Sequence, residues 1–389
     1  MDPFEILPEE IHEDLLRFFN VTEVIDTLSF VSKTWYDIVA SSKICLQKTK
    51  LNLRSQRKTD FSERIETLRW MSRKGGRGYK HLQMNCLLDE EISKESWNFL
   101  DAMKISVETI NIRSMKLDER LKEIFLPNLE ELKLMFVPRE AMDLIIKSGS
   151  NLKILHMRNE FPLCYDGIDY TPSESTIASI KQLVQTNEKL EELELQGRPN
   201  FLSLFQQDLS EFVNFHLTKL IVKIEMSAEK VLPLNIEHLI KFLIHQSASL
   251  KHVYIDSCGT NVIKHVFNQM PEVNFIRFDI ELREPNKFVI KDLEMTPNEK
   301  ITQLELPYIA LFDDLKEFLD LAPNLEEILV GHANPRLLEY IGKNLPKLKL
   351  MVYRYDDCAG TCELSYTNMR RDHPDFNQNI KFSLCNDFL

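Results

Sequence analysis

Groups of residues with the spacing of a catalytic or metal site are scarce in this sequence. The nearest to a metal site is a set of three thiols and one imidazole, Cys358, Cys362, His373 and Cys385, whose spacing matches no defined zinc pattern. A glycine-rich stretch at 75–78 lacks the Gly-Lys-Ser/Thr that would hold a phosphate. Neither Gly-x-Ser-x-Gly nor His-Glu-x-x-His occurs. We therefore expect no enzyme activity, no metal and no cofactor.

Charged residues divide the chain into three parts of alternating sign. Residues 1–42 hold nine acids and two bases, a net of −7, and residues 43–80 hold twelve bases and three acids, a net of +9. Because the whole chain carries −12, residues 81–389 carry the remaining −14. An acidic total disfavours general binding to nucleic acid or to anionic membranes.

The basic stretch at 43–80 leaves a nucleic-acid contact open as an alternative. Its bases lack regular aromatic neighbours, which single-stranded nucleic acid would need for stacking. Within it, four apolar residues recur at helical spacing, which favours a helix whose charges are solvated: Phe61, Ile65, Leu68 and Met71. A nucleic-acid partner is therefore not expected, and contact with an acidic partner or with the chain's own acidic residues 1–42 is preferred.

Composition indicates a folded protein of a particular kind. Hydrophobic residues make up 43% and charged residues 28%, which supports a core, whereas only 10 of 389 residues are glycine. Scarce glycine argues against folds built on glycine-rich phosphate loops or dense tight turns. The seven cysteines are scattered, the N-terminus lacks a signal peptide, and no apolar run is long enough for a membrane span. We expect an intracellular location, cytoplasmic and/or nuclear, and no membrane partner.

The first 45 residues predict a small helical module. Apolar residues recur on one face between Pro8 and Phe19, and Pro8 suits the first position of a helix. A second helix is expected at 22–30 and a third at 32–40, with Ser32 as its N-cap. The module has more large apolar side chains than so few residues can bury. Some of them should pack against another surface, either a partner or the rest of the chain.

The order and helical phase of this module resemble a known family. Three groups carry the resemblance: Leu7-Pro8-x-Glu10-Ile11, then Leu15, Phe18-Phe19, Val24 and Leu28, and finally Val31-Ser32-x-x-Trp35-Tyr36. Over residues 4–46 they look like an F-box. Ile44-Cys45-Leu46 stands where that family usually has a tryptophan, which weakens the last contact.

The F-box resemblance implies docking on a Skp-type linker protein, and through it on the cullin and RING subunits of an SCF-type ubiquitin ligase. Carried over position by position, the implied linker-binding residues are Leu7, Pro8, Ile11, Leu15, Phe18, Phe19, Val24, Leu28, Val31, Ser32 and Trp35.

The rest of the chain repeats one unit, apolar-x-x-apolar-x-apolar, at intervals of 22 to 38 residues. Copies begin at Tyr79, Val107, Leu129, Leu152, Leu190, Leu217, Leu250, Val273, Ile301, Leu325 and Leu348, with a degenerate first copy at Lys48. Amphipathic helices are expected between copies, for example at 138–149, 171–187, 235–247 and 334–345. Strand, turn and helix at this period predict an α/β solenoid.

The repeat resembles the leucine-rich-repeat family, which implies a horseshoe with parallel strands on the concave side and helices on the convex side. We therefore expect three segments. Residues 1–46 form a small three-helix F-box, 47–355 form a solenoid of about 11 to 12 irregular repeats, and 356–389 form a C-terminal tail or cap. Together, head and body resemble an F-box/leucine-rich-repeat protein.

Strand alternation selects the side chains that would face a partner. The third, fifth and seventh positions of each unit should project from the concave sheet. The expected substrate-binding residues at such positions are His156, Arg158, Lys219, Ile221, Lys223, His252, Tyr254, Phe275 and Arg277. Tyr254, Phe275 and Ile221 flanked by cations resemble apolar anchors within a polar rim.

These readings predict a non-catalytic adaptor that holds an unknown protein substrate on its repeats while other subunits transfer ubiquitin. A RING ligase of its own would need about eight paired Cys or His ligands, and no Cys-x-x-Cys occurs. The alternative is a leucine-rich-repeat interaction scaffold with no role in degradation.

Overall fold

The chain divides into two compact units, Met1–Leu190 and Glu191–Leu389. In the computed structural model, the described residues are 8–18, 31–42, 50–54, 80–85, 98–103, 106–113, 126–135, 151–158, 181–182, 185–197, 214–224, 236–256, 260–279, 294–307, 309, 312–331, 335–354 and 380–385. No helix among them is both long and apolar enough to cross a membrane.

Two helices of the N-terminal module are described, α1 (Glu9–Arg17) and α3 (Lys33–Ser41). Pro8 is the N-cap of α1, one position before its expected place, and the Ser32 hydroxyl accepts a hydrogen bond from the Trp35 backbone N–H at 3.2 Å. The predicted cap of the third helix is therefore confirmed. The helix expected at 22–30 lies outside the described residues.

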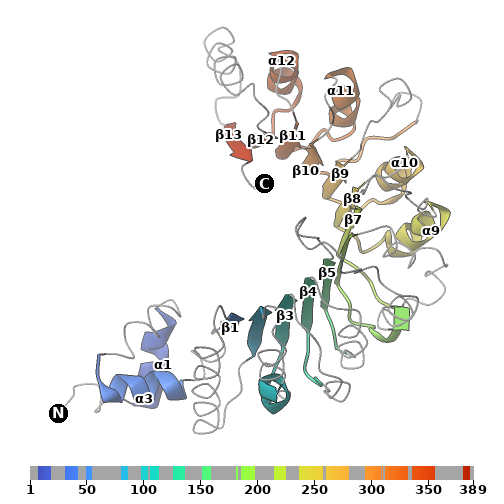
Figure 1. The fold of residues 1–389 in the computed structure, drawn as a ribbon. Coiled ribbons are helices and arrows are strands. Elements are labelled where there is room, and N and C mark those ends of the chain that lie inside the picture. The colour runs from blue at the N-terminus through green and yellow to red at the C-terminus, as the bar shows by residue number, and fades with distance from the viewer. Residues whose placement is uncertain are drawn as a thin grey trace, which may run out of the picture. The chain divides into compact units, whose positions relative to one another are not determined.

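Five parallel strands follow in the first unit, each hydrogen-bonded to the next in chain order (Figure 1). They are β1 (Lys50–Arg54), β2 (His81–Asn85), β3 (Thr109–Arg113), β4 (Glu131–Met135) and β5 (Ile154–Arg158).

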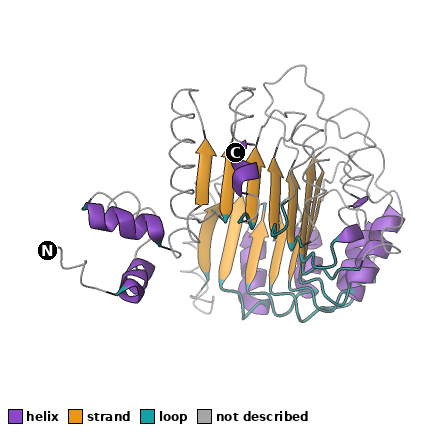
Figure 2. Cartoon of the chain, turned by 90° about the horizontal axis from the view of Figure 1, so that it is seen from below, coloured by secondary structure: helices purple, strands orange, loops and turns teal. Residues whose placement is uncertain are grey.

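The second unit continues the same pattern with strands and helices. Its parallel strands are β6 (Glu192–Gly197), β7 (Lys219–Ile224), β8 (His252–Asp256), β9 (Phe275–Asp279), β10 (Gln303–Leu306), β11 (Glu327–Val330), β12 (Leu350–Arg354) and β13 (Lys381–Cys385). Its described helices are α9 (Ile236–Gln246), α10 (Thr260–Gln269), α11 (Phe312–Asp320) and α12 (Pro335–Asn344), all on one face of the sheet (Figure 2).

The predicted repeat positions locate the strands. Every strand from β1 to β12 begins two residues after a predicted copy begins, as β8 does after Leu250 and β11 after Leu325. From β3 to β12 the opening apolar residue is buried. From β2 to β11 the second and fourth residues of each strand are buried too, as Val253 and Ile255 are in β8. In each unit these buried side chains form the core on one face of the sheet. The fold is compatible with a repeat solenoid.

The predicted helices are confirmed where the structure describes them. Helix α9 falls within the expected 235–247 and α12 within 334–345. The helix expected at 138–149 lies outside the described residues, and most of 171–187 does too. Strand β13, which pairs with β12, lies in the segment expected to form a tail or cap.

Buried amides connect successive repeats where the chain enters a strand. At the end of α9, Gln246 accepts a hydrogen bond from the Leu217 N–H at 2.7 Å and donates one to the Phe215 carbonyl at 3.0 Å. Asn187 similarly accepts from the Leu152 N–H at 3.0 Å. Each amide satisfies backbone groups that would otherwise be buried without partners.

Ion pairs connect the residues that immediately precede neighbouring strands. Glu130 pairs with Lys153 at 2.9 Å, and Glu326 pairs with Lys349 at 2.7 Å. All four side chains are substantially exposed, so each pair contributes little to stability. They lie at the edge of the sheet where the strands begin, which distinguishes them from the side chains on its face.

Candidate functional site

The N-terminal helices expose large apolar side chains to solvent. Phe18 is 85% exposed, Val31 62% and Ile11 42%, and Pro8 is also exposed. We call these four residues the N-terminal apolar surface. Exposed apolar groups gathered on so small a module are typical of a surface that a partner covers.

The same helices have a small core of their own. Leu16, Trp35 and Val39 are buried together, with Ile38 packed against them. Trp35, expected among the linker-binding residues, therefore lies inside the module, because the third helix turns its indole toward α1. Ser32 caps that helix. Of the other expected linker-binding residues, Leu15 is half-buried, and Leu7, Phe19, Val24 and Leu28 lie outside the described residues.

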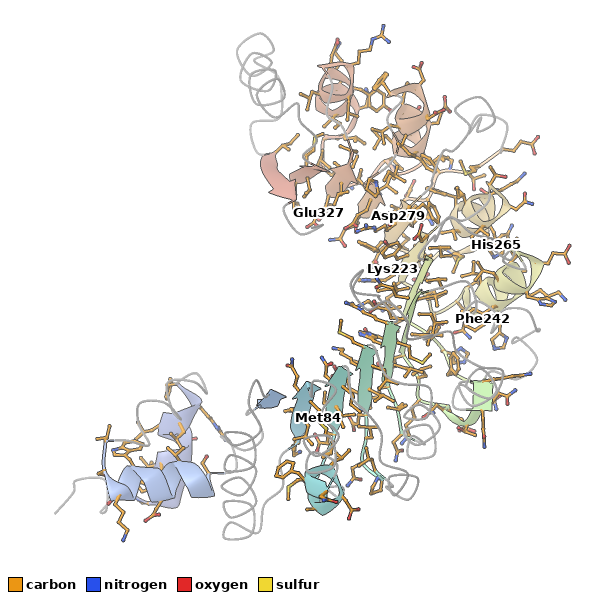
Figure 3. All side chains as sticks on the ribbon, viewed as in Figure 1. Met84, Lys223, Phe242, His265, Asp279 and Glu327 are labelled. Carbon is orange, nitrogen blue, oxygen red and sulfur yellow. The ribbon has the colours of Figure 1, made fainter. Side chains whose placement is uncertain are left out.

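In the second unit, one face of the sheet is turned away from the helices. The first, third and fifth residues of each strand lie on it, and we call it the open face. Figure 3 labels three of its residues, Lys223, Asp279 and Glu327, while Phe242 and His265 come from the helices. Every expected substrate-binding residue of this unit lies on the open face: Lys219, Ile221, Lys223, His252, Tyr254, Phe275 and Arg277.

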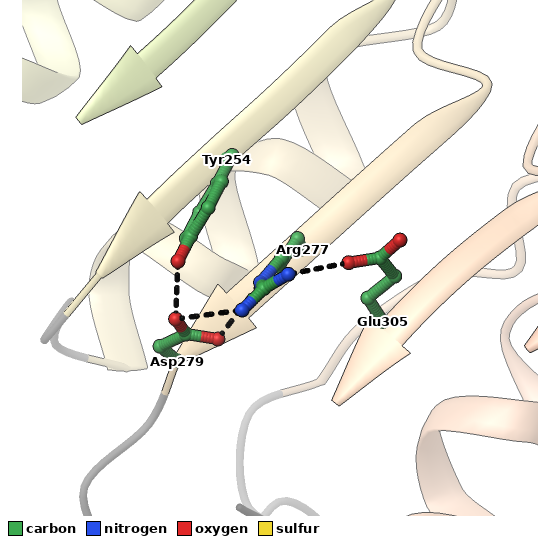
Figure 4. Close-up of polar contacts among 4 residues, drawn as sticks. All are labelled: Tyr254, Arg277, Asp279 and Glu305. Atoms are coloured by element: carbon green, nitrogen blue, oxygen red, sulfur yellow. Dashed lines mark hydrogen bonds and ion pairs between the residues drawn. The ribbon is translucent and has the colours of Figure 1, made fainter. Parts of the chain in front are cut away.

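Two of those residues belong to a buried polar network (Figure 4). The Arg277 Nε and Nη2 donate to the two oxygens of Asp279 at 3.0 and 3.3 Å, and Nη1 donates to Glu305 at 2.9 Å. The Tyr254 hydroxyl donates to Asp279. Tyr254 is 7% exposed and Arg277 8%, so both side chains are largely covered.

Cations flank the Tyr254 ring. The Lys223 Nζ lies 4.9 Å from the ring centroid and the Arg277 Cζ 4.5 Å from it. Burial, followed by the nearby Asp279 carboxylate, raises the pKa of Tyr254, so the phenol stays a hydrogen-bond donor. Burial, the largest single effect, disfavours the charged guanidinium, but the hydrogen bond to Asp279 together with the charges of Tyr254, Asp279 and Glu305 raises the pKa of Arg277. Tyr254 and Arg277 therefore form the buried floor of the open face, held by contacts within the chain.

The half-buried aromatic pair His252 and Phe275 lies on the next row of the open face. Their rings stack with centroids 5.5 Å apart and an interplanar angle of 24°. Lys219 lies opposite His252 in the register and pairs with Glu192 at 3.2 Å. The rings of His252 and Phe275 keep part of their apolar surface accessible to solvent, whereas Tyr254 is buried.

The two remaining expected substrate-binding residues belong to the first unit. His156 and Arg158 are the third and fifth residues of β5, and both are half-buried. They alternate along the strand with the core residues Leu155 and Met157. Their positions on the strand follow the expected alternation.

Burial and the nearby Lys219 lower the pKa of His252, against a smaller raising effect of Glu192. Unfolded histidine binds its proton near about pH 6.5, whereas folded His252 stays neutral to lower pH. Its contribution to stability is therefore present above about pH 6.5 and is lost as the pH falls. We expect His252→Gln to reduce the fall in unfolding free energy on acidification, measured by urea denaturation. The exposed His245 supplies the control, and an equal effect of His245→Gln would contradict the assignment.

Three carboxylates were not among the expected site residues: Asp279, Glu305 and Glu327. All three lie at projecting positions of their repeat copies, Asp279 in the copy that begins at Val273 and Glu305 and Glu327 in the copies that begin at Ile301 and Leu325. Extending the alternation rule over those copies would have found them.

A metal site would need several ligating side chains close together. No group of three or more His, Cys, Asp or Glu suited to a metal ion occurs in the described part of the chain. Cys358, Cys362 and His373 lie outside that part, and Cys385 ends β13.

Comparison with protein families bears on the N-terminal apolar surface. Residues 4–47 match the F-box domain. The chain thus carries an F-box at the segment where α1 and α3 expose their apolar residues. An F-box implies an adaptor role linked through a Skp-type protein to SCF ubiquitin ligases, and F-box proteins are generally non-catalytic. Comparison of the chain with curated proteins finds no match.

Proposed function

We propose that this chain is a substrate-recognition adaptor of a ubiquitin ligase. Its F-box docks on a Skp-type linker, and its leucine-rich-repeat-like body holds a protein for ubiquitination by the cullin and RING subunits. The observation that supports it most is the N-terminal apolar surface, because Ile11, Phe18 and Val31 are three of the four large hydrophobic side chains that stand exposed among the described residues.

Docking would bury that surface. Apolar surface removed from water contributes about 25 cal/mol per Å² before the costs of association, so three large side chains supply a substantial driving force. Pro8, Ile11, Phe18 and Val31 would contact the linker directly. Ser32 and Trp35 would act through the helices that they cap and pack.

In the second unit the repeat body would bind the substrate through the open face. In the first unit His156 and Arg158 of β5 stay expected substrate contacts on their own strand. Ile221, His252 and Phe275 offer accessible apolar surface on the open face, whereas Tyr254 and Arg277 set the shape beneath it. A scaffold that holds a protein near the conjugating enzyme raises the effective concentration of its lysines, and this proximity is the whole of the mechanism.

A pull-down tests the central claim. The full chain should retain a purified Skp-type linker protein, and the Leu7→Ala/Pro8→Ala variant should lose most of it. Failure of the wild-type chain to bind would remove the proposal. A reconstituted ligase assay distinguishes the adaptor from the alternative scaffold. A scaffold without a degradation role would bind the linker but would promote no ubiquitin transfer to captured proteins.

A further inference from the structure

The charge of the side chains on the open face changes between β9 and β12. Over β10 and β11 it carries two half-buried carboxylates, Glu305 and Glu327, and the described residues of these two strands include no Lys or Arg. Arg277 on β9 reaches one of them, binding Glu305 Oε2 at 2.9 Å. That guanidinium also holds Asp279, so its charge is shared between two carboxylates.

Glu327 has a neutral partner. Its Oε2 accepts a hydrogen bond from the Gln303 amide at 2.8 Å, and no ion pair to it occurs among the described residues. In the parallel register Gln303 lies opposite Glu327 and Glu305 lies opposite Leu329, so the two carboxylates are diagonal neighbours. One strand spacing and two residues separate their backbones by about 8 Å. A lysine or arginine head from outside can therefore approach both carboxylates.

Apolar side chains border the carboxylates on both sides. Leu350 and Val352 of β12 are half-buried on the same face, opposite Glu327 and Leu329. On the other side lies half-buried Phe275, opposite Gln303. The face therefore alternates carboxylates with aliphatic or aromatic surface, which suits the apolar stems and charged heads of basic side chains.

We propose that the open face over β9 to β12 binds a basic amphipathic segment of a protein, with a Lys or Arg head between Glu305 and Glu327 and apolar neighbours on Phe275, Leu350 and Val352. This inference rests on the proposed function and names the class of substrate. Charge complementarity supports it twice. At the open-face positions of β9 to β12 three carboxylates, Asp279, Glu305 and Glu327, stand against two cations, Arg277 and Arg354. Residues 81–389 carry −14, a field that attracts basic partners.

A peptide-binding measurement with the full chain tests the proposal. The probe is a fluorescein-labelled short peptide of alternating arginine and leucine, followed by fluorescence anisotropy. We expect saturable binding that Glu327→Gln weakens by about tenfold or more, because the partly buried carboxylate loses its charge. Glutamine at 327 retains hydrogen-bonding capacity toward Gln303, so the fold should persist. Glu305→Gln should weaken binding in the same direction.

The neighbouring Glu326 provides the matched control. Glu326→Gln removes the same charge one residue away, at the sheet edge where Glu326 pairs with Lys349. It should change the affinity little. An equal loss from Glu326→Gln would overturn the proposal in favour of nonspecific attraction by net charge.

Two further peptides distinguish the contribution of the basic side chains to binding from that of the apolar side chains. Alternating glutamate and leucine should not bind, and alternating arginine and serine should bind more weakly than arginine and leucine. Absence of arginine–leucine binding to the wild-type chain would also overturn the proposal. Linker pull-down with the same preparation is independent of these variants, so loss of peptide binding with retained linker binding refutes only the substrate class.

Discussion

Replacing Phe18 with alanine should weaken binding of the Skp-type linker by about 2 kcal/mol or more, roughly 30-fold, without unfolding the F-box. The ring is 85% exposed in the chain alone, so it contributes little to the fold. In a complex it would be covered, and large aromatic side chains at the centre of an interface carry a disproportionate share of the binding energy. Isothermal titration with the purified linker measures the change.

Leu16 is the informative comparison for Phe18. It lies two residues earlier on α1 and is 1% exposed, packed against Trp35 and Val39. Leu16→Ala should cost about 2–5 kcal/mol of stability, much of what so small a module has. Hydrogen exchange at α1 and α3 should rise for Leu16→Ala and stay unchanged for Phe18→Ala. If Phe18→Ala left linker affinity intact, the N-terminal apolar surface would not be the docking surface.

The strands of the repeat body could be predicted because one local rule governs them. From β3 to β12 an apolar residue two positions before the strand is buried, and alternate residues after it enter the same core, as in Leu250, Val253 and Ile255. Because this packing requires apolar residues at fixed positions only a few residues apart, the pattern is visible in a short stretch of sequence. Sequence therefore located β1 to β12 without knowledge of their neighbours.

Strand β13 shows where that rule fails. Two positions before it stands Asn379, which is polar, so the unit lacks its opening apolar residue. The strand nevertheless pairs with β12 along its whole length, and Ile380 directly before it is buried. Hydrogen bonding to the edge of β12 therefore accompanies a strand that the local sequence pattern does not predict.

The polar network on the open face depends on register, which the sequence pattern does not contain. Alternation placed Tyr254 and Arg277 on this face. Parallel pairing puts them opposite one another, and Asp279, two residues further along β9, comes within reach of both. The Tyr254 hydroxyl and the Arg277 guanidinium bond to partners inside the chain. For this reason the expected anchor Tyr254 and the expected rim cation Arg277 are both covered.

Breaking this polar network should cause the second large effect, a loss of stability. Arg277→Met should lower the free energy of unfolding of the surrounding repeats by about 3–5 kcal/mol, because it removes one partner of a buried ion pair. Asp279 would keep only the Tyr254 hydroxyl, and its side chain is only 9% exposed, so water cannot replace the guanidinium. Glu305, at 25% exposure, can be solvated more readily.

A double variant distinguishes a lost charge from lost packing. In Arg277→Met/Asp279→Asn both buried charges are gone, and the loss should be smaller than in Arg277→Met alone. Unfolding of a repeat array need not be two-state, so hydrogen exchange at β8, β9 and β10 in increasing urea is the suitable measurement. Equal or greater destabilisation of the double variant would mean that the arginine acts through its packing. The smaller loss would instead show that Asp279 requires a cation, and that the floor of the open face is electrostatically fixed before any partner arrives.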